Sequence, residues 1–282
     1  MKKIIITGAT GLVGMNLLAL LHENNLANVK SRLASSQYEI IAIDKNRTNL
    51  RLGKKLFPEV HFEAADLAQP GTWEELFKNA YIVIQLQAQI SSASPEPYAR
   101  NNIHSVKNVL TACHKHKVKH LIHFSSSVVI SVAKDHYTNT KRIGEQLVAE
   151  SKVPHTILRP PLMYGCFDVK HLGFLTKILE ISPIFPMPGS GKYLRQPLFV
   201  EDACRIVLKL MENENSQSPK GMGYPLTAQG VFKVCDTLDN GDLMQNNPTT
   251  ASSGVSQTNK EKPQNKAYNI IGKEKIHLID LL

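Results

Sequence analysis

The sequence has 282 residues, of which 42% are apolar and 20% charged, a composition typical of folded globular proteins and unlike fibres or disordered chains. Lys and Arg outnumber Asp and Glu by 33 to 24, and the net charge of +9 favours anionic partners without naming one. The four cysteines form no C-x-x-C pair, so neither a zinc knuckle nor a disulfide framework is indicated. No apolar run reaches the length of about 18 residues that a membrane span needs. We therefore expect a cytoplasmic protein without a membrane span.

Short β-branched runs alternate with helical patterns through the first 165 residues. Residues 4–6 form such a run, a turn with glycines follows, and apolar residues then recur at helical spacing from Leu12 to Leu21. Further strands are predicted at 40–43, 60–62, 81–84, 121–124 and 156–158, with helices over 72–78, 103–110 and 137–151. This alternation predicts a doubly wound parallel sheet with helices on both faces, the Rossmann type of α/β fold.

The composition changes after Pro160 and Pro161. Prolines cluster between residues 183 and 197, and a helix is predicted from about 200 to 210. Residues 240–266 carry too few apolar side chains to offset the entropy of ordering, which predicts a disordered insertion. A strand at 267–271 and a helix beginning at 276 are expected to follow. We predict a dinucleotide-binding domain at 1–165 and a smaller, irregular substrate domain at 166–282.

The turn after the first strand reads T-G-A-T-G-L-V-G at residues 7–14. A chain that passes tightly from a strand into a helix, and whose N–H groups approach a pyrophosphate, favours residues without a Cβ. The positive end of the helix dipole then faces the phosphates. The residues predicted to bind the pyrophosphate are Gly8, Thr10, Gly11, Leu12, Val13 and Gly14.

Two acids follow the next two strands. Asp44 lies 30 residues beyond Gly14, whereas the usual gap to the ribose-binding acid is about 20 residues, so the helix or loop around 24–37 is expected to be enlarged. Its carboxylate would bind the adenosine ribose hydroxyls and repel a 2′-phosphate, which favours NAD over NADP, although Lys45 and Arg47 oppose this preference. Asp66, followed by Leu67, is expected to accept a hydrogen bond from the adenine amino group.

A phenol and an ammonium group follow the fifth strand. Tyr137 and Lys141 are four residues apart and so share a helix face, and a nearby cation is expected to lower the phenol pKa, as general acid/base catalysis requires. The serines at 125–127 stand at the carboxyl end of the preceding strand, where ligands bind in sheets of this kind.

This ordered set resembles the extended short-chain dehydrogenase/reductase family, the NAD-dependent nucleotide-sugar epimerases and dehydratases. The resemblance covers about 1–210 and returns at 267–282. It rests on the motifs above and on Ile82 to Ala88, Asn102 and Ile103, Asn108 to Leu110, Leu158 to Pro160, Tyr164 and Gly165, Gly189 to Gly191, Val200 to Asp202, and Tyr268 to Ile270.

The resemblance implies a role for each residue of the site. Tyr137 would take a proton from a sugar hydroxyl while a hydride passes to the nicotinamide, Lys141 would hold the nicotinamide ribose, and Ser127 would bind the reacting oxygen. Ser126 or Ser125 replaces Ser127 if the register is shifted, or the serines only satisfy backbone groups at the strand end. Asn102 would brace the active-site helix. Cofactor contacts are also expected from Leu67, Gln87, Tyr137, Lys141 and Pro160.

The chain also departs from the family pattern. Gln85 and Gln87 stand in the strand that usually reads V-I-H-L-A-A, and Gln87 places an amide beside the cofactor path. Only nine residues separate Ser127 from Tyr137, where the family generally has a longer substrate loop. Val128 and Val129 supply no acid after the serines, which argues against a 4,6-dehydratase and against a decarboxylase.

Other chemistry-bearing residues receive simpler interpretations. The histidine- and lysine-rich run at 114–120 is interpreted as a solvated face at a helix end rather than a metal site or a phosphate patch. Lys192 and Arg195 are candidates for binding a substrate diphosphate, with structural packing as the alternative. Cys166 and Cys204 are interpreted as packing residues, and no metal site is predicted.

The sequence thus predicts an NAD-dependent nucleotide-sugar epimerase or 4-keto reductase that works through a keto-sugar intermediate. Its expected partner is a nucleoside-diphosphate sugar or similar small molecule and not a nucleic acid, and a homodimer is compatible with the pattern. Two alternatives stay open: a non-catalytic NAD(P)-binding assembly subunit, and a reductase of a sterol-like or small carbonyl substrate.

Overall fold

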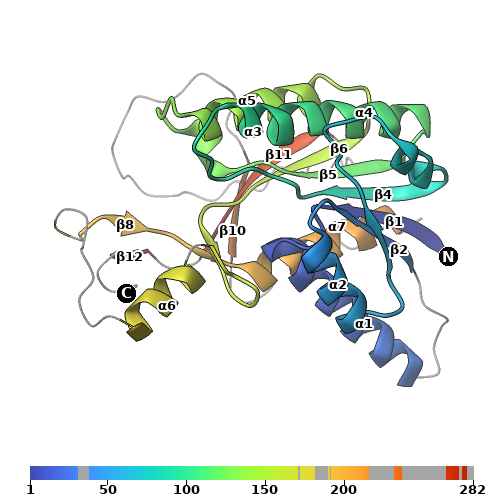
Figure 1. The fold of residues 1–282 in the computed structure, drawn as a ribbon, viewed down its shortest axis with the longest axis horizontal. Coiled ribbons are helices and arrows are strands. Elements are labelled where there is room, and N and C mark those ends of the chain that lie inside the picture. Colours follow the sequence, from blue (N-terminus) through green and yellow to red (C-terminus); the bar gives the residue numbers. More distant parts are fainter. Residues whose placement is uncertain are drawn as a thin grey trace, which may run out of the picture.

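A parallel sheet covered by helices on both faces forms the body of the protein (Figure 1). The computed structural model describes residues 1–30, 38–170, 172–181, 190, 192–215, 232–236, 265–272 and 275–277. Within the part of the chain that it describes, no helix is both long and apolar enough to cross a bilayer.

The sheet has seven parallel strands and one antiparallel edge strand. The parallel strands lie in the order β3 (His61–Ala64), β2 (Tyr38–Asp44), β1 (Lys2–Thr7), β4 (Ala80–Gln85), β5 (His120–Phe124), β6 (His155–Arg159) and β11 (Lys266–Gly272). The antiparallel strand β10 (Phe232–Asp236) pairs with β11. Because the strand order reverses between β1 and β4, the carboxyl ends of these two strands mark the position where such sheets bind ligands.

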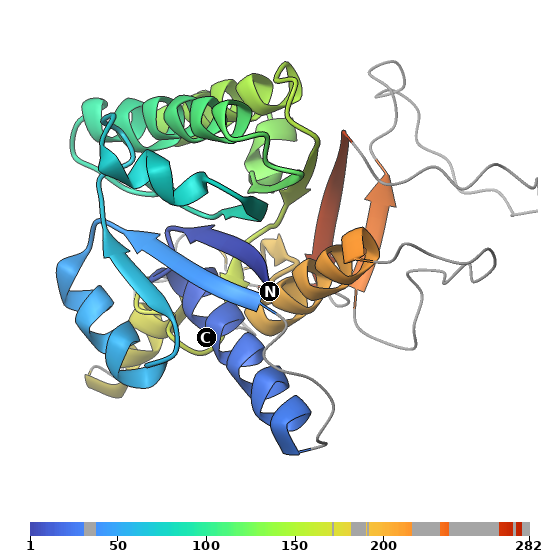
Figure 2. The same cartoon turned by 90° about the vertical axis from the view of Figure 1, so that its right-hand side faces the viewer.

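Each face of the sheet carries its own set of helices (Figures 1 and 2). One face is covered by α1 (Leu12–Lys30), α2 (Arg47–Leu56) and α7 (Val200–Asn215). The other is covered by η1 (Thr72–Phe77), α3 (Glu96–Ala99), the π-helical turn η2 (Arg100–His104), α4 (Ser105–Lys115) and α5 (His136–Ala149). The shorter elements are η3 (Ser127–Ile130), β7 (Met163–Tyr164), α6 (Leu172–Ile181), β8 (Leu194–Arg195), β9 (Leu198–Phe199) and β12 (Ile276–His277).

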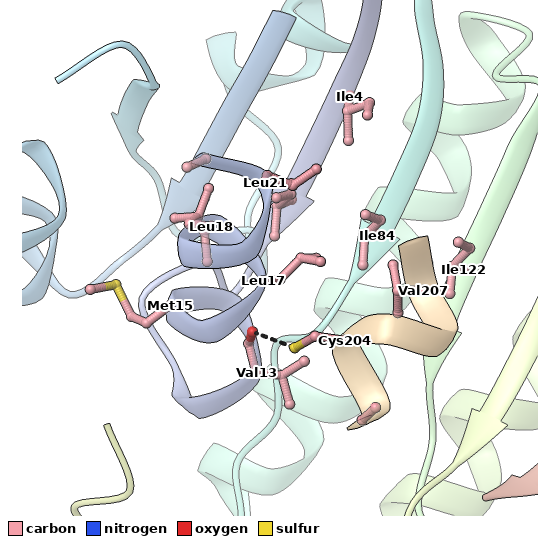
Figure 3. Close-up of a cluster of buried hydrophobic side chains, with 14 of the residues drawn as sticks. Ile4, Val13, Met15, Leu17, Leu18, Leu21, Ile84, Ile122, Cys204 and Val207 are labelled. Carbon is pink, nitrogen blue, oxygen red and sulfur yellow. Dashed lines mark hydrogen bonds between the residues drawn. The ribbon is translucent and has the colours of Figure 1, made fainter. Parts of the chain in front are cut away.

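The apolar core lies in two layers, one on each side of the sheet. Between the sheet and α1 and α7, Leu17 and Leu18 pack with Ile84 and Val207 (Figure 3). The Cys204 thiol lies in this layer, 3.6 Å from the Val13 carbonyl oxygen to which it donates, and burial raises its pKa to about 12. This confirms Cys204 as a packing residue. Residues after 165 also contribute to the main sheet and its helix layer, since α7 packs on α1 and β11 pairs with β6. The predicted domain boundary at 165 stays a prediction.

One local prediction is wrong, one is found in part, and one lies mostly outside the described residues. The helix predicted from 276 is wrong at its start, because Ile276 and His277 pair with Arg195 and Leu194 as β12. The enlargement expected around 24–37 is found in α1, which continues to Lys30, while 31–37 lie outside the described residues. Of the predicted insertion at 240–266, residues 240–264 lie outside the described residues, and Lys266 already belongs to β11.

Candidate active site

The glycine-rich turn brings β1 against the end of β4. Gly8 has a φ of +68°, and a Cβ at this position would lie 2.5 Å from the backbone nitrogen of Gln87. A Cβ at Gly14 would meet the Ala9 carbonyl oxygen at 2.4 Å. The turn opens α1, whose first turn carries no acid. The amide donors and the positive end of the helix dipole therefore fit the pyrophosphate of a dinucleotide.

Gly8 and Gly11 provide a matched test of this turn. We expect Gly8→Ala to lower the free energy of unfolding by about 3 kcal/mol, because the new methyl group combines positive φ with overlap of backbone atoms. At Gly11 a Cβ would make an ordinary contact of 3.4 Å with the Gly8 carbonyl oxygen, so Gly11→Ala should change stability by less than about 1 kcal/mol. It should still weaken NAD binding, since it adds a methyl group to the turn that is predicted to approach the pyrophosphate. Urea unfolding and titration calorimetry measure both effects, and equal destabilisation by the two variants would contradict this account of the turn.

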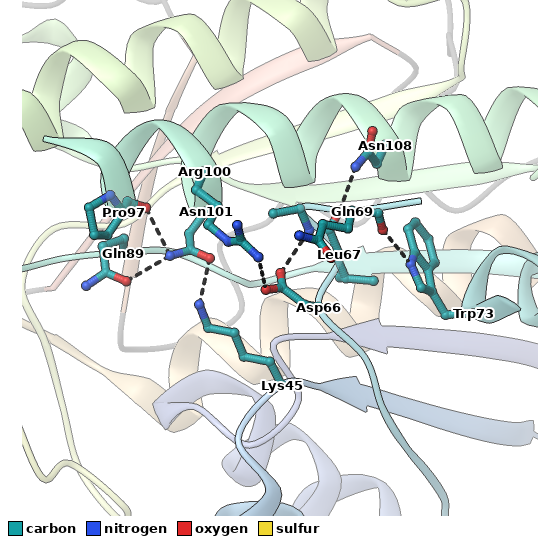
Figure 4. Close-up of polar contacts among 11 residues, drawn as sticks. Lys45, Asp66, Leu67, Gln69, Trp73, Gln89, Pro97, Arg100, Asn101 and Asn108 are labelled. Carbon is teal, nitrogen blue, oxygen red and sulfur yellow. Dashed lines mark hydrogen bonds and ion pairs between the residues drawn. The ribbon is translucent and has the colours of Figure 1, made fainter. Parts of the chain in front are cut away.

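Asp44 joins the turn to the end of β2. One carboxylate oxygen accepts a hydrogen bond from the Thr10 backbone nitrogen at 3.0 Å, and the other accepts from the Asn46 backbone nitrogen at 3.0 Å. The Nζ of Lys45 donates to Asn101 Oδ1 at 2.7 Å (Figure 4). The cation that was expected to oppose the preference for NAD is thus bound to a neutral amide on η2.

Asp66 lies in an ion pair that sequence reasoning did not find. Arg100 Nη2 is 2.7 Å from one carboxylate oxygen, and the Ala68 backbone nitrogen donates to the other at 3.0 Å (Figure 4). Burial acts to raise the pKa of Asp66, but the Arg100 and Ala68 hydrogen bonds outweigh it and hold the pKa below its ordinary value. These contacts therefore hold Asp66 as an anion, and its contact with the adenine stays a prediction. Leu67 is fixed beside it, because Asn108 Nδ2 donates to its carbonyl oxygen at 2.9 Å.

We expect Asp44→Asn to change cofactor preference. The amide keeps an acceptor for the Thr10 nitrogen but removes the charge, so NAD affinity should fall about tenfold while NADP loses a repulsion and binds relatively better. Calorimetric titration with both nucleotides gives the ratio of dissociation constants. Glu39→Gln, an exposed charge removal on the same strand, is the control and should leave the ratio unchanged. An unaltered ratio in Asp44→Asn would contradict the assigned role.

Tyr137 and Lys141 lie on α5, whose first turn is fixed by Asp135. Asp135 caps the helix by accepting from the Thr138 backbone nitrogen at 2.9 Å. Lys141 is only 3% exposed, and its Nζ donates to the Phe124 carbonyl oxygen at the end of β5, 2.8 Å away. Burial lowers the Lys141 pKa to about 8. The ammonium group is thus held against the strand end that carries the serines.

The Tyr137 phenol behaves differently from the sequence-based expectation. Burial raises its pKa, a hydrogen bond from the Ser126 side chain lowers it, and the Asp135 charge raises it further. The expected lowering of the pKa by Lys141 is therefore wrong: the ammonium group is bound to the Phe124 carbonyl, and Ser126 is the neighbour that lowers the phenol pKa.

The three serines occupy distinct positions. Ser126 is buried and begins η3 as its cap, accepting from the Val128 backbone nitrogen at 3.4 Å. Ser127 is half-buried, and its backbone nitrogen donates to the Pro160 carbonyl oxygen at 2.8 Å, which places Pro160 beside the serines. Ser125 is buried behind them. The structure thus brings Ser126, the alternative to Ser127, to the phenol.

Two polar groups hold α5 in place. Asn102 Nδ2 donates to Thr140 Oγ1 and to the Gln89 carbonyl oxygen, each at 3.0 Å, so its amide ties α5 to the chain after β4. Arg159, at the end of β6, forms a buried bidentate ion pair with Glu145, in which Nε lies 3.0 Å from each carboxylate oxygen. The helix that carries Tyr137 and Lys141 is therefore fixed both to the sheet and to η2.

The two glutamines of β4 and its extension have different environments. Gln85 is buried within the sheet, where its Oε1 lies 2.8 Å from His123 Nδ1. Gln87 lies beside the glycine turn: its Oε1 accepts from the Thr7 hydroxyl at 2.5 Å, and its Nε2 donates to Ser105 Oγ at 3.4 Å. Gln87 therefore lies beside the glycine turn, where the cofactor is predicted to bind, whereas Gln85 lies inside the sheet.

Several candidates lie apart from this site. Lys192 and Arg195 are both exposed, on and beside the two-stranded β8–β12 sheet rather than the main sheet. In the histidine- and lysine-rich run, Lys115 pairs with Glu75 at 2.8 Å, as a solvated helix end predicts. His120 corrects that interpretation, because it is buried in β5 with its Nε2 2.9 Å from Thr156 Oγ1. Cys166 is exposed. Among the residues that the structure describes, no three His, Cys, Asp or Glu side chains are grouped to hold a metal ion.

A dinucleotide-type turn and a Ser/Tyr/Lys set at one edge of a doubly wound sheet define an NAD-dependent α/β enzyme. The chain belongs to the NAD dependent epimerase/dehydratase family, whose family model matches residues 4–222. NAD is the cofactor of this family and of this enzyme.

Individual relatives are more distant. A putative UDP-glucose 4-epimerase of Methanocaldococcus jannaschii is 25% identical over 263 residues, covering 82% of this chain and 80% of the relative. Ceramide reductase of Caulobacter vibrioides is 27% identical over 146 residues, which are 52% of this chain and 45% of that protein. Among solved structures, the UDP-glucuronic acid 4-epimerase of Bacillus cereus in complex with NAD aligns with a TM-score of 0.68 and 21% identity over 99% of this chain and 81% of its own. This structural likeness establishes the shared fold.

Proposed function

We propose that the protein is a nucleotide-sugar epimerase that oxidises a sugar hydroxyl to a ketone and reduces it again on the opposite face. The observation that carries this proposal is the position of Tyr137 at the start of α5, with Lys141 of the same helix anchored at 2.8 Å to the Phe124 carbonyl oxygen, at the strand end that the serines follow. The similarity to UDP-sugar 4-epimerases supports the choice of a nucleoside-diphosphate sugar as substrate.

The residues of the site divide the chemistry between them. Tyr137 accepts the hydroxyl proton and later returns it, while Ser127, with Ser126 as the alternative, donates a hydrogen bond to the reacting oxygen. Lys141, held at the end of β5, orients the cofactor ribose. NAD, when bound, supplies the hydride acceptor and a positive charge. The proton and the hydride both return to the sugar, so each turnover leaves the cofactor unchanged.

An isotope experiment tests this function. A panel of UDP-hexoses and UDP-uronic acids carrying deuterium at C4 is incubated with the protein and NAD, and the products are resolved by NMR. Epimerisation through a ketone predicts the C4 epimer with its deuterium retained and no net formation of NADH. Loss of the deuterium to solvent, or no epimer from any member of the panel, would refute the proposal.

A carbonyl reductase is the second candidate, because ceramide reductase matches half of this chain. The two diphosphate candidates, Lys192 and Arg195, are exposed on a separate small sheet, and a reductase of this kind does not require them. It predicts stoichiometric NADH consumption with a sterol-like ketone or another small carbonyl substrate. Lys192 and Arg195 remain predictions for the epimerase, where Arg195→Gln should raise the KM for a UDP-sugar more than it lowers kcat.

A further inference from the structure

One side chain holds the short segment between the serines and Tyr137. The guanidinium group of Arg142, on α5, donates from Nε to the Val129 carbonyl oxygen at 2.9 Å and from Nη1 to the Ala133 carbonyl oxygen at 2.9 Å. A third hydrogen bond runs from Nη2 to the Ser131 carbonyl oxygen. Three alternate carbonyls, at 129, 131 and 133, therefore point at one planar group with fixed donor directions.

The segment has little apolar packing of its own. Ile130 is 60% exposed and Val132 is 96% exposed, so burial of side chains does not fix its path. Its local bonds are those of short turns, such as the one from the Ser131 backbone nitrogen to the Val128 carbonyl oxygen at 3.0 Å. Ordering each residue costs about 1 to 2 kcal/mol of conformational entropy. The side-chain bonds from α5 to its backbone carbonyls that offset this cost are the three from Arg142 and one from Asn139 Nδ2 to the Lys134 carbonyl oxygen at 3.0 Å, and Arg142 alone reaches the middle of the segment.

Both ends of the segment carry residues of the site. At its start, Ser126 caps η3, and its side chain is the neighbour that lowers the pKa of the Tyr137 phenol. At its end, Asp135 caps the helix that begins with His136 and Tyr137. Arg142 ties the middle of the segment to that same helix, so a change in its contacts shifts Ser126 relative to Tyr137.

We propose that Arg142 is a positioning residue that sets the contact between Ser126 and Tyr137. This inference rests on the proposed function, in which Tyr137 transfers the proton. Only nine residues separate Ser127 from Tyr137, whereas the family generally has a longer loop there. The role proposed for Arg142 explains how this short connection is held, because a side chain of α5 supplies its tertiary contacts.

Titration of the Tyr137 phenol tests the inference without a substrate. The phenolate absorbance is followed against pH in the wild type and in Arg142→Gln, and in each background the signal of the matching Tyr137→Phe variant is subtracted. Since the Ser126 hydrogen bond lowers the phenol pKa, loosening that contact should shift the titration to higher pH. Arg142→Lys, which cannot reach three carbonyls together, should recover little of the shift, whereas added guanidinium ion should recover part of it in Arg142→Ala.

Kinetics give the second readout. We expect Arg142→Gln to lower kcat about 10- to 100-fold while the NAD dissociation constant changes less than twofold. Arg205→Gln removes an exposed helical arginine paired with Glu201 and should change neither quantity.

The outcomes separate this inference from the function on which it rests. An unshifted Tyr137 titration in Arg142→Gln overturns the inference, as does a variant that has lost both its folded structure and NAD binding, because the role is then structural. If the wild type epimerises sugars and Tyr137→Phe is inactive, but Arg142→Gln turns over normally, the positioning role alone fails. If Tyr137→Phe remains active, the proposed function fails.

Discussion

Replacement of Tyr137 by Phe should lower kcat by about 10²- to 10⁴-fold, the usual contribution of a positioned general acid/base. The substitution removes only the phenol oxygen, and Lys141 keeps its bond to the Phe124 carbonyl. NAD affinity and the free energy of unfolding should therefore stay close to those of the wild type. Steady-state kinetics, calorimetric titration with NAD and urea unfolding make the three measurements.

Tyr81→Phe is the matched control for this variant. Tyr81 lies on β4, where its ring stacks under the Lys2 ammonium group at 4.1 Å from the ring centroid, and a phenyl ring keeps that contact. This control should retain full activity. Substantial turnover in Tyr137→Phe would mean that another group moves the proton, and the buried Ser126 would be the first to examine.

Local patterns were sufficient to predict most of the cofactor half. The glycine turn, the strand ends at Asp44 and Asp66 and the helical pair Tyr137 and Lys141 depend on neighbours within a few residues, so spacing alone locates them. The strands of the sheet are continuous apolar runs because both of their faces are buried. The family match and the strand order confirm this fold.

Contacts between distant segments could not be predicted in the same way. Arg100 and Asp66 are 34 residues apart, and the partners of Arg142 are backbone carbonyls, which every residue possesses. Ser126, and not Ser127, is the serine that lowers the pKa of the phenol, and this difference of one residue in register could not be predicted from the sequence. The rise in the Tyr137 pKa depends on burial by the whole fold, which a spacing of four residues does not report.

The buried ammonium group of Lys141 should lower the free energy of unfolding of the enzyme at neutral pH. Burial lowers its pKa to about 8 from an ordinary 10.5, so below pH 8 both the folded and the unfolded chain carry the proton and the folded state bears the full cost of the buried charge. Between these two pKa values the folded chain loses the proton that the unfolded chain keeps, and the free energy of unfolding rises with pH. The whole difference amounts to about 3 kcal/mol.

Lys141→Met should therefore inactivate the enzyme and also raise its free energy of unfolding at neutral pH. At pH 7, removing the buried charge should raise the free energy of unfolding by about 3 kcal/mol. The Phe124 carbonyl loses its donor, which costs about 1 kcal/mol. The variant should therefore be more stable than the wild type by about 2 kcal/mol. The difference in free energy of unfolding between the variant and the wild type should shrink as the pH rises from 8 to 10.5. At higher pH the wild type should be the more stable of the two. Urea unfolding across this range measures it, with the exposed Lys119→Met as a control that should show no such trend. A variant that is less stable than the wild type at pH 7 would contradict the cost assigned to the buried charge, and would mean that Lys141 supports the fold as well as the binding of the cofactor.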